Sequence, residues 1–309
     1  MPLHPQSQAF IDLLQQLSPP DWSEMEPEEA RTSFAGLGEF FGTGPEVGSV
    51  TDHRTDDGTR IRIYKPGDGR TPPPVAVFFH GGGWVLGDVD THDSLCRRLS
   101  ATSGCAVASV DYPRSPEAKH PMIDEACLRA ADWTVRHAAD LGIDGNRVAV
   151  VGDSAGGHLA ATVALRCRDA GLSWRPKLQL LIYPVMEPDF QTSSYVAFAE
   201  GHGLTREAMR YFWGCYAGDG EVPVAAMPPA ADTLVDLPPA HIVTAEYDVL
   251  RDEGEAYAAM LSNAGVPVTL RRYEGMLHGF VHMAGFFDVG REAGEELGKV
   301  LAAHLQPDN

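Results

Sequence analysis

The sequence is poor in basic residues relative to acidic ones. Lysine and arginine together number 24 against 43 aspartates and glutamates in 309 residues, which gives a formal net charge of −19. A surface of this charge repels nucleic acid and anionic membranes. We therefore expect neither as a partner.

Cysteine is scarce as well. The five cysteines are widely spaced and odd in number, and no two of them form a CxxC pair. This usage predicts free thiols in a reducing compartment and argues against a disulfide framework or a zinc site.

Long apolar runs are also lacking, and we expect no leader segment. No apolar run approaches the ~20 residues that a membrane span needs. The first residues, Met1 to Pro5, carry no positively charged region. We expect a soluble, cytoplasmic protein.

A pattern of strand, sharp turn and helix surrounds Ser154. The apolar run 148–151 precedes Gly152-Asp153-Ser154-Ala155-Gly156-Gly157, and a segment rich in alanine and leucine follows. A turn this tight pushes its central residue towards positive φ, and small flanking residues relieve the crowding. The G-x-S-x-G pattern is typical of a nucleophile elbow. A glycine-rich turn without chemistry is the alternative.

Strands and helices alternate along most of the chain after an antiparallel hairpin at Asp57-Gly58. This order predicts a mostly parallel, doubly wound sheet with right-handed crossovers, which is an α/β fold. We expect strands at 48–55, 59–64, 75–79, 105–110, 148–151, 178–183, 240–245 and 268–273, with helices at 92–103, 121–139, 252–264 and 290–305.

Two segments depart from the alternation. Helices expected at 7–17 and from residue 27 onwards precede the first strand, and 187–238 has no clear strand but an aromatic-rich helix at 205–216. We interpret residues 1–45 and 187–238 as a helical cap over a catalytic domain formed by 46–186 and 239–309. An ordinary packed helix is the alternative for 205–216.

A serine nucleophile needs a base to remove its proton and an acid to orient that base. Asp248 directly follows the strand at 240–245, and His278 lies just beyond the final strand, which is the order expected for this architecture. Ser154, His278 and Asp248 are therefore the predicted nucleophile, base and acid. Glu246 is the second choice for the acid. We interpret His282 as a residue behind the site or at the surface.

A glycine-rich segment, His80-Gly81-Gly82-Gly83-Trp84, follows the buried strand at 75–79. Backbone N–H groups that stabilise a tetrahedral intermediate must approach closely, so glycine suits this place. We assign the N–H groups of Gly82, Gly83 and Ala155 to an oxyanion hole, and His80 to holding the loop; a plain flexible loop is the alternative. The residues expected to line the substrate pocket are Trp84, Asp153, Phe34, Phe212 and Trp213.

These segments together resemble the hormone-sensitive-lipase-like family of microbial carboxylesterases, which are α/β-hydrolases, over nearly the full chain. The resemblance implies the Ser154, Asp248 and His278 triad, an eight-stranded sheet, a helical cap, short acyl substrates and pairing of two copies through the edge strand near 266–273. The matching segments are 80–84, Asp111-Tyr112, Pro116-Glu117, 152–157, Tyr183-Pro184, 250–254 and His278-Gly279-Phe280.

The chain departs from this family at two places. Pro113-Arg114-Ser115 stands where the family has Arg-Leu-Ala, in the loop expected to brace His80, and Val249 stands where the family has proline. Neither change removes a catalytic group.

The sequence thus predicts a serine carboxylesterase that hydrolyses short- to medium-chain acyl esters through an acyl-enzyme, with no metal or organic cofactor. An amidase, a deacetylase or an acyltransferase could use the same triad. A ligand receptor on a hydrolase fold is the alternative outside enzymes.

Overall fold

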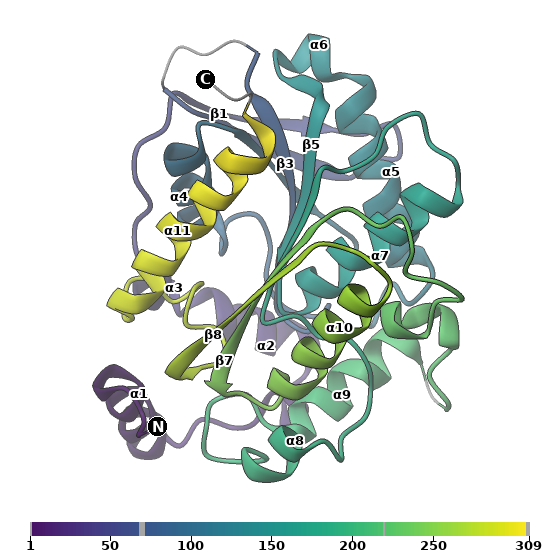
Figure 1. Ribbon diagram of the computed structural model, residues 1–309. Helices are drawn as coiled ribbons and strands as arrows, with labels where there is room; N and C mark the ends of the chain where they lie inside the picture. The colour runs from purple at the N-terminus through teal and green to yellow at the C-terminus, as the bar shows by residue number, and fades with distance from the viewer. Residues whose placement is uncertain (1, 68–71, 219, 307–309) are drawn as a thin grey trace.

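A central sheet organises the protein, whose computed structural model describes residues 2–67, 72–218 and 220–306. Within them the eight strands have the order β1-β2-β4-β3-β5-β6-β7-β8 (Figure 1). β2 pairs antiparallel with β1 and β4, and the other neighbours are parallel. The strands are β1 (Ser49–Arg54), β2 (Arg60–Lys65), β3 (Pro74–Phe79), β4 (Ala106–Asp111), β5 (Asp144–Asp153), β6 (Leu178–Ile182), β7 (Ala240–Tyr247) and β8 (Val268–Leu277).

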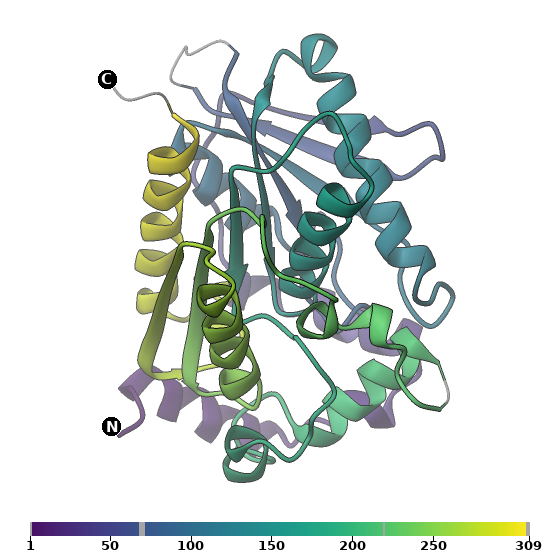
Figure 2. The ribbon, with the colours of Figure 1, turned by 45° about the vertical axis from the view of Figure 1, so that its right-hand side comes forward.

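Helices cover both faces of this sheet. α4 and α11 pack together on one face, while α5, α7 and α10 cover the other (Figures 1 and 2). The predicted α/β-hydrolase architecture is therefore confirmed. The bounds are α4 (Asp93–Ser103), α5 (Met122–Arg136), α6 (Ala138–Leu141), α7 (Ala155–Asp169), α10 (Arg251–Asn263) and α11 (Asp288–Leu305).

The core lies on both sides of the sheet because its central strands are apolar on both faces. All six residues of β3 are buried, as are all five of β6. Such buried and mostly apolar runs, in which Gln179 of β6 is the polar residue, suit parallel strands that helices cover on either side. The carboxyl ends of β3, β5, β7 and β8 consequently meet at one rigid edge.

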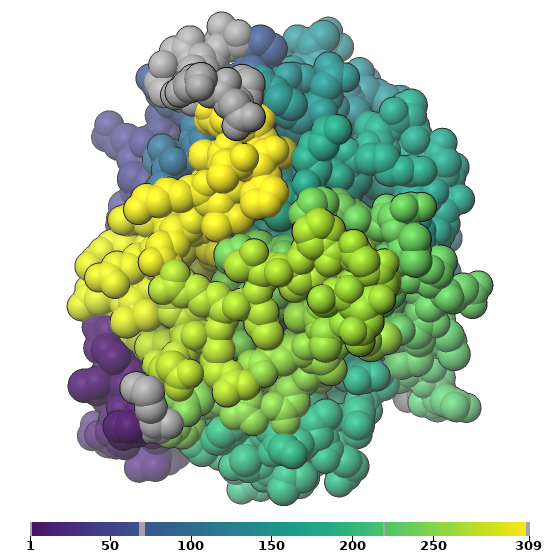
Figure 3. Space-filling model, viewed as in Figure 1, coloured from purple at the N-terminus to yellow at the C-terminus, as the bar shows by residue number. Residues whose placement is uncertain are grey.

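A further group of helices lies at that carboxyl edge, at the lower end of the molecule in Figures 1 and 2. In Figure 3 the N-terminal segment, in purple, and the segment around α8, in teal, form this end of the visible face. The bounds are α1 (Pro5–Leu17), α2 (Pro27–Ala35), α3 (Gly38–Phe41), α8 (Ser193–Ala197) and α9 (Arg206–Ala217), with short 3₁₀ turns at Trp22–Glu24, Val224–Ala226 and Pro228–Ala230.

The helix expected from residue 27 onwards is two helices. α2 ends at Ala35 and is followed by Gly36, and α3 begins only at Gly38. Glycine disfavours a helix interior because it gives up more backbone freedom than other residues. The break turns the following segment and carries Phe41 to a buried position.

Within the described residues, no helix combines the length and the apolar character that crossing a membrane requires. All five cysteines are free, and four of them are buried.

One buried histidine should make stability depend on pH. The Nε2–H group of His158 on α7 donates to the Ala226 carbonyl oxygen at 2.7 Å, and burial lowers the pKa of His158 to about 4 from 6.5. The unfolded chain therefore binds more protons than the folded one between these values, so stability falls as pH falls.

We expect the melting temperature to decrease between about pH 7 and pH 4.5, and His158→Gln to make this decrease shallower, since glutamine can donate the same hydrogen bond without titrating. Thermal unfolding followed across this range measures both slopes. Identical slopes in the two proteins would contradict the effect.

Candidate active site

Ser154 lies at the turn between β5 and α7. Its φ is 55°, a left-handed value that costs free energy for a residue with a side chain. The turn is tight enough that a Cβ added to Gly152 would collide with the Gly156 carbonyl oxygen, and one added to Gly156 would collide with that of Phe79. The two glycines thus allow the serine to adopt its strained position at the sheet edge.

His278 and Asp248 reach this serine from the next strand ends. His278 follows β8 and Asp248 follows β7. The His278 Nε2 atom lies 3.0 Å from Ser154 Oγ, and its Nδ1 atom lies 2.7 Å from Asp248 Oδ2. Because a carboxylate can only accept, Nδ1 carries the proton and Nε2 is free to accept from the serine hydroxyl. Three residues distant in sequence therefore form one hydrogen-bonded chain.

Asp248 is held in place from its other side. Its Oδ1 atom accepts a hydrogen bond from the Leu250 backbone N–H at 3.0 Å, and the residue is only 2% exposed. Glu246, the alternative acid, instead accepts from the Gly275 N–H at 2.6 Å. The geometry therefore favours Asp248 over Glu246 as the partner of His278.

The glycine loop after β3 lies beside Ser154. Gly82 and Gly83 have φ values of 109° and 59°, which glycine adopts without strain, and both border the same cavity as the serine. Their N–H groups make no hydrogen bond to other described residues. The Ala155 N–H is the first of α7, where helix N–H groups have no partner within the helix. All three groups are thus available to an oxyanion.

The loop is braced by residues 112–115, of which 113–115 depart from the family pattern. The Tyr112 hydroxyl donates to the His80 carbonyl oxygen at 2.7 Å, and the two rings stack at 4.1 Å. The Ser115 N–H donates to Trp84 O, and Arg114 donates to Gly87 O. The changed sequence therefore still supports the loop, and His80 contributes packing at its start.

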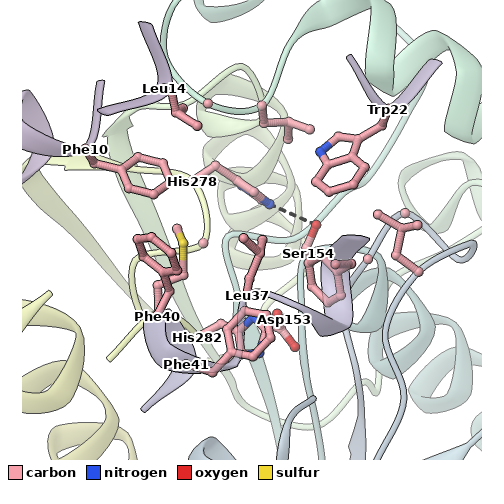
Figure 4. A pocket seen from close by; sticks show the side chains of 18 of the residues that line it. Phe10, Leu14, Trp22, Leu37, Phe40, Phe41, Asp153, Ser154, His278 and His282 are labelled. Carbon is pink, nitrogen blue, oxygen red and sulfur yellow. Dashed lines mark hydrogen bonds between the residues drawn. The ribbon is translucent and has the colours of Figure 1, made fainter. Parts of the chain in front are cut away.

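A cavity of about 270 Å³ opens above Ser154 and His278, with a largely apolar wall (Figure 4). Of the predicted pocket residues, Phe34, Phe212 and Asp153 line it. The lining also includes Phe10, Leu13, Leu14, Leu17, Pro19, Trp22, Leu37, Phe40, Phe41, Gly82, Gly83, Leu86, His92, Gly203, Leu204, Met209, Gly279, His282 and Met283.

The predicted placement of Trp84 and Trp213 in this pocket is wrong. Trp84 has a φ of 61°, and its indole packs away from the cavity, stacked on Tyr216 at 4.3 Å. Trp213 packs against Trp84 in the same aromatic cluster, with ring centroids 4.9 Å apart. Both tryptophans are buried there, so they pack α9 against the glycine loop on the side away from the cavity.

Most of the residues that form the pocket wall were not predicted individually from the sequence. α1 supplies four wall residues and the segment 34–41 supplies another four. The amphipathic spacing of α1 indicated an apolar face, but nothing in the sequence specified which part of the chain this face would cover.

His282 is buried, so its expected alternative position at the surface is wrong. Its ring stacks between Phe41 at 4.1 Å and His92 at 3.9 Å, and its Nε2–H donates to the Thr91 carbonyl oxygen. Burial, assisted by nearby His92, lowers the pKa of His282 to about 3. Burial opposes ionisation of adjacent Asp153, yet His92 holds the pKa of this carboxyl below its usual value.

Among the described residues, one group of side chains could act together as metal ligands. It consists of His92, Asp153 and His282, whose donor atoms lie within 4.8 Å of one another. The two imidazole planes differ by only 5° and lie face to face. A histidine nitrogen binds a metal in the plane of its ring, so one ion cannot lie in both planes at once. The stacked arrangement does not fit a metal centre.

Comparisons with known proteins agree with this geometry. A family model described as alpha/beta hydrolase fold matches residues 76–282. The esterase LipI of Mycobacterium tuberculosis is 41% identical over 76% of this chain and 74% of its own length, and the ethyl acetate hydrolase of Pseudomonas putida is 33% identical over 91% of both. The crystal structure of a thermostable esterase from Pseudomonas putida superposes with a TM-score of 0.92, at 36% identity over 99% of each chain.

These relatives confirm the predicted resemblance and the assignment to the carboxylic ester hydrolases. The chain belongs to the α/β-hydrolase fold family, within its hormone-sensitive-lipase-like group of esterases.

Proposed function

We propose that the protein is a serine carboxylesterase in which Ser154, His278 and Asp248 form the catalytic triad. The observation that carries this proposal is the continuous hydrogen-bonded chain from Ser154 Oγ to Asp248, at the floor of an apolar cavity. The relatives' names support the reaction class, because they include a carboxylic ester hydrolase and an arylesterase.

The proposed reaction follows from the positions of these groups. His278 Nε2 takes the Ser154 proton as Oγ attacks the ester carbonyl carbon, and the Gly82, Gly83 and Ala155 N–H groups donate to the resulting oxyanion. The protonated imidazole, stabilised by Asp248, then gives its proton to the leaving alcohol oxygen. Water, activated by the same imidazole, attacks the acyl-enzyme and releases the acid.

Short- to medium-chain acyl esters are the proposed substrates. The cavity of about 270 Å³ is enclosed by bulky apolar side chains such as Phe34 and Phe212. An apolar wall stabilises an alkyl chain by removing it from water. The ethyl acetate hydrolase relative, by its name, acts on an ester of a short acid.

We also propose that residues 1–45 and 187–238 act as the cap of this site. α1, α2, α3 and α9 all contribute side chains to the cavity wall from outside the sheet. The cap therefore determines how much of the substrate can be enclosed.

Shortening Phe212 should lengthen the accepted acyl chain. Its ring lies against Gly83, so a Cβ on that glycine would collide with it. Phe212→Ala removes this wall, and we expect kcat/KM for p-nitrophenyl octanoate relative to butyrate to rise at least about tenfold. A chain-length series measures the ratio.

Trp213→Phe is the matched control, because Trp213 neighbours Phe212 on α9 but lies outside the cavity. Its chain-length profile should stay that of the wild type. A shift in the control, or no shift with Phe212→Ala, would contradict the assigned wall.

The experiment for the reaction class is a panel of matched esters and anilides with acyl chains from acetate to dodecanoate. We expect ester turnover to dominate and to peak at or below medium chain length. Preferential cleavage of anilides would favour the amidase alternative. Acyl transfer to added alcohols would favour the acyltransferase, and binding without turnover would favour the receptor. A maximum above about ten carbons would contradict the proposed substrate size.

A cytoplasmic location and pairing of two copies through β8 complete the proposal. β8 is at the end of the sheet, next to β7, and exposes Leu270 on this edge. Free cysteines suit a reducing compartment. Sedimentation of the protein would show whether it pairs.

A further inference from the structure

Three carbonyl oxygens in the glycine loop or directly after it accept hydrogen bonds from two other segments of the chain. Two come from the 112–115 segment, which binds the His80 and Trp84 carbonyls at 2.7 and 2.9 Å. A third comes from α2, where Arg31 Nε donates to the Val85 carbonyl oxygen at 2.9 Å. The position of the loop therefore depends partly on the N-terminal helices.

Arg31 joins these segments through one guanidinium. Besides Val85, it donates to the Ser115 carbonyl oxygen at 2.8 Å and to both carboxylate oxygens of Glu117 at 2.9 and 2.6 Å. It also contacts Glu28, one turn earlier on α2. The side chain is only 10% exposed. Arginine offers five donors in a rigid planar fork, so it can serve all of these acceptors in one orientation, which lysine cannot.

The same helix also borders the substrate cavity. Phe34 lies three residues beyond Arg31 on α2 and lines the cavity. Residues three apart on a helix lie close together on its surface. One helix thus contacts the substrate wall through Phe34 and the glycine loop through Arg31.

We infer that Arg31 is a positioning residue of the cap that fixes the Gly82 and Gly83 N–H groups for the transition state. This inference rests on the proposed function, because it assumes that these groups bind an oxyanion. Arg31 contacts no reacting atom and acts through Val85 and Ser115. Its loss should therefore affect the chemical step more than substrate binding.

The test compares Arg31→Lys and Arg31→Ala with the wild type on p-nitrophenyl butyrate. A misplacement of about 1 Å can cost on the order of 100-fold in rate, and we expect kcat to fall about 10- to 100-fold while KM changes less than about threefold. Added methylguanidinium should restore part of the kcat of Arg31→Ala by occupying the vacated guanidinium site. Wild-type kcat in Arg31→Lys, a rise in KM alone, or no rescue would overturn the inference.

Two further variants separate positioning from general destabilisation. Glu117→Gln removes an exposed ion-pair partner but leaves both carbonyl contacts of Arg31, so its kcat should stay within about threefold. Arg210→Lys on α9 changes another cap arginine, which pairs with Glu207 in solvent, and should behave as the wild type. A loss of kcat in either variant equal to that of Arg31→Lys would also overturn the inference.

Melting temperatures and the fraction of Ser154 labelled by a fluorophosphonate are measured for every variant. Labelled, folded Arg31 variants with low kcat support the positioning role. If the wild type showed neither labelling nor ester turnover, the proposed function itself would be refuted. Failure of the proposed function can therefore be distinguished from failure of the Arg31 inference.

Discussion

Replacing Ser154 with alanine should abolish ester hydrolysis, with a loss of kcat of about 10⁶-fold. The Oγ atom lies 3.0 Å from His278 Nε2 and is the nucleophile of the proposed acyl-enzyme. Without it no covalent intermediate can form, and only the slow attack of water on a bound ester is left. Hydrolysis of p-nitrophenyl acetate and butyrate measures the loss.

The Ser154→Ala protein should keep its fold, because the change removes only the hydroxyl. The smaller alanine side chain fits the same buried position, which is 7% exposed. A melting temperature close to that of the wild type provides the control. Substantial turnover by a correctly folded variant would refute Ser154 as the nucleophile.

Asp248→Asn should have the second largest effect, a decrease in kcat of about 10⁴-fold. The carboxylate accepts the Nδ1–H of His278 at 2.7 Å. An asparagine amide in its place can donate to Nδ1 and so hold the proton on Nε2, where it blocks acceptance of the serine proton. Kinetics on the same esters measure the loss in kcat.

Glu246→Gln is the matched control for Asp248→Asn. Glu246 lies two residues earlier on β7, and glutamine can still accept from the Gly275 N–H. Its kcat should stay near the wild-type value. If Glu246→Gln lost as much activity as Asp248→Asn, the assignment of the acid would be wrong.

The sheet and the meeting of Ser154, His278 and Asp248 were predictable because both depend on local patterns. Buried parallel strands read as continuous apolar runs, and the residue just past each run lies at the same edge of the sheet. The structure extends β8 to Leu277, so that His278 follows it directly. The small residues around Ser154 likewise indicate a tight turn, and this signal does not depend on the packing of distant segments.

The cavity wall was less predictable because aromatic residues occur both in the walls of cavities and in hydrophobic cores. Phe212 and Trp213 are adjacent on α9, yet Phe212 faces the cavity and Trp213 faces Trp84 behind it. The direction of each side chain follows from the rotation of α9 about its axis, which is set by tertiary packing. The break between α2 and α3 and the contacts of Arg31 depend in the same way on packing between distant segments.

Peptide mass spectrometry after treatment with a fluorophosphonate tests most directly whether Ser154 is an activated nucleophile. We predict one stoichiometric adduct on Ser154 in the wild type, slower labelling in Asp248→Asn, and no adduct in Ser154→Ala. Stoichiometric labelling of another residue, or an unlabelled Ser154 in protein that still hydrolyses esters, would contradict the proposed mechanism.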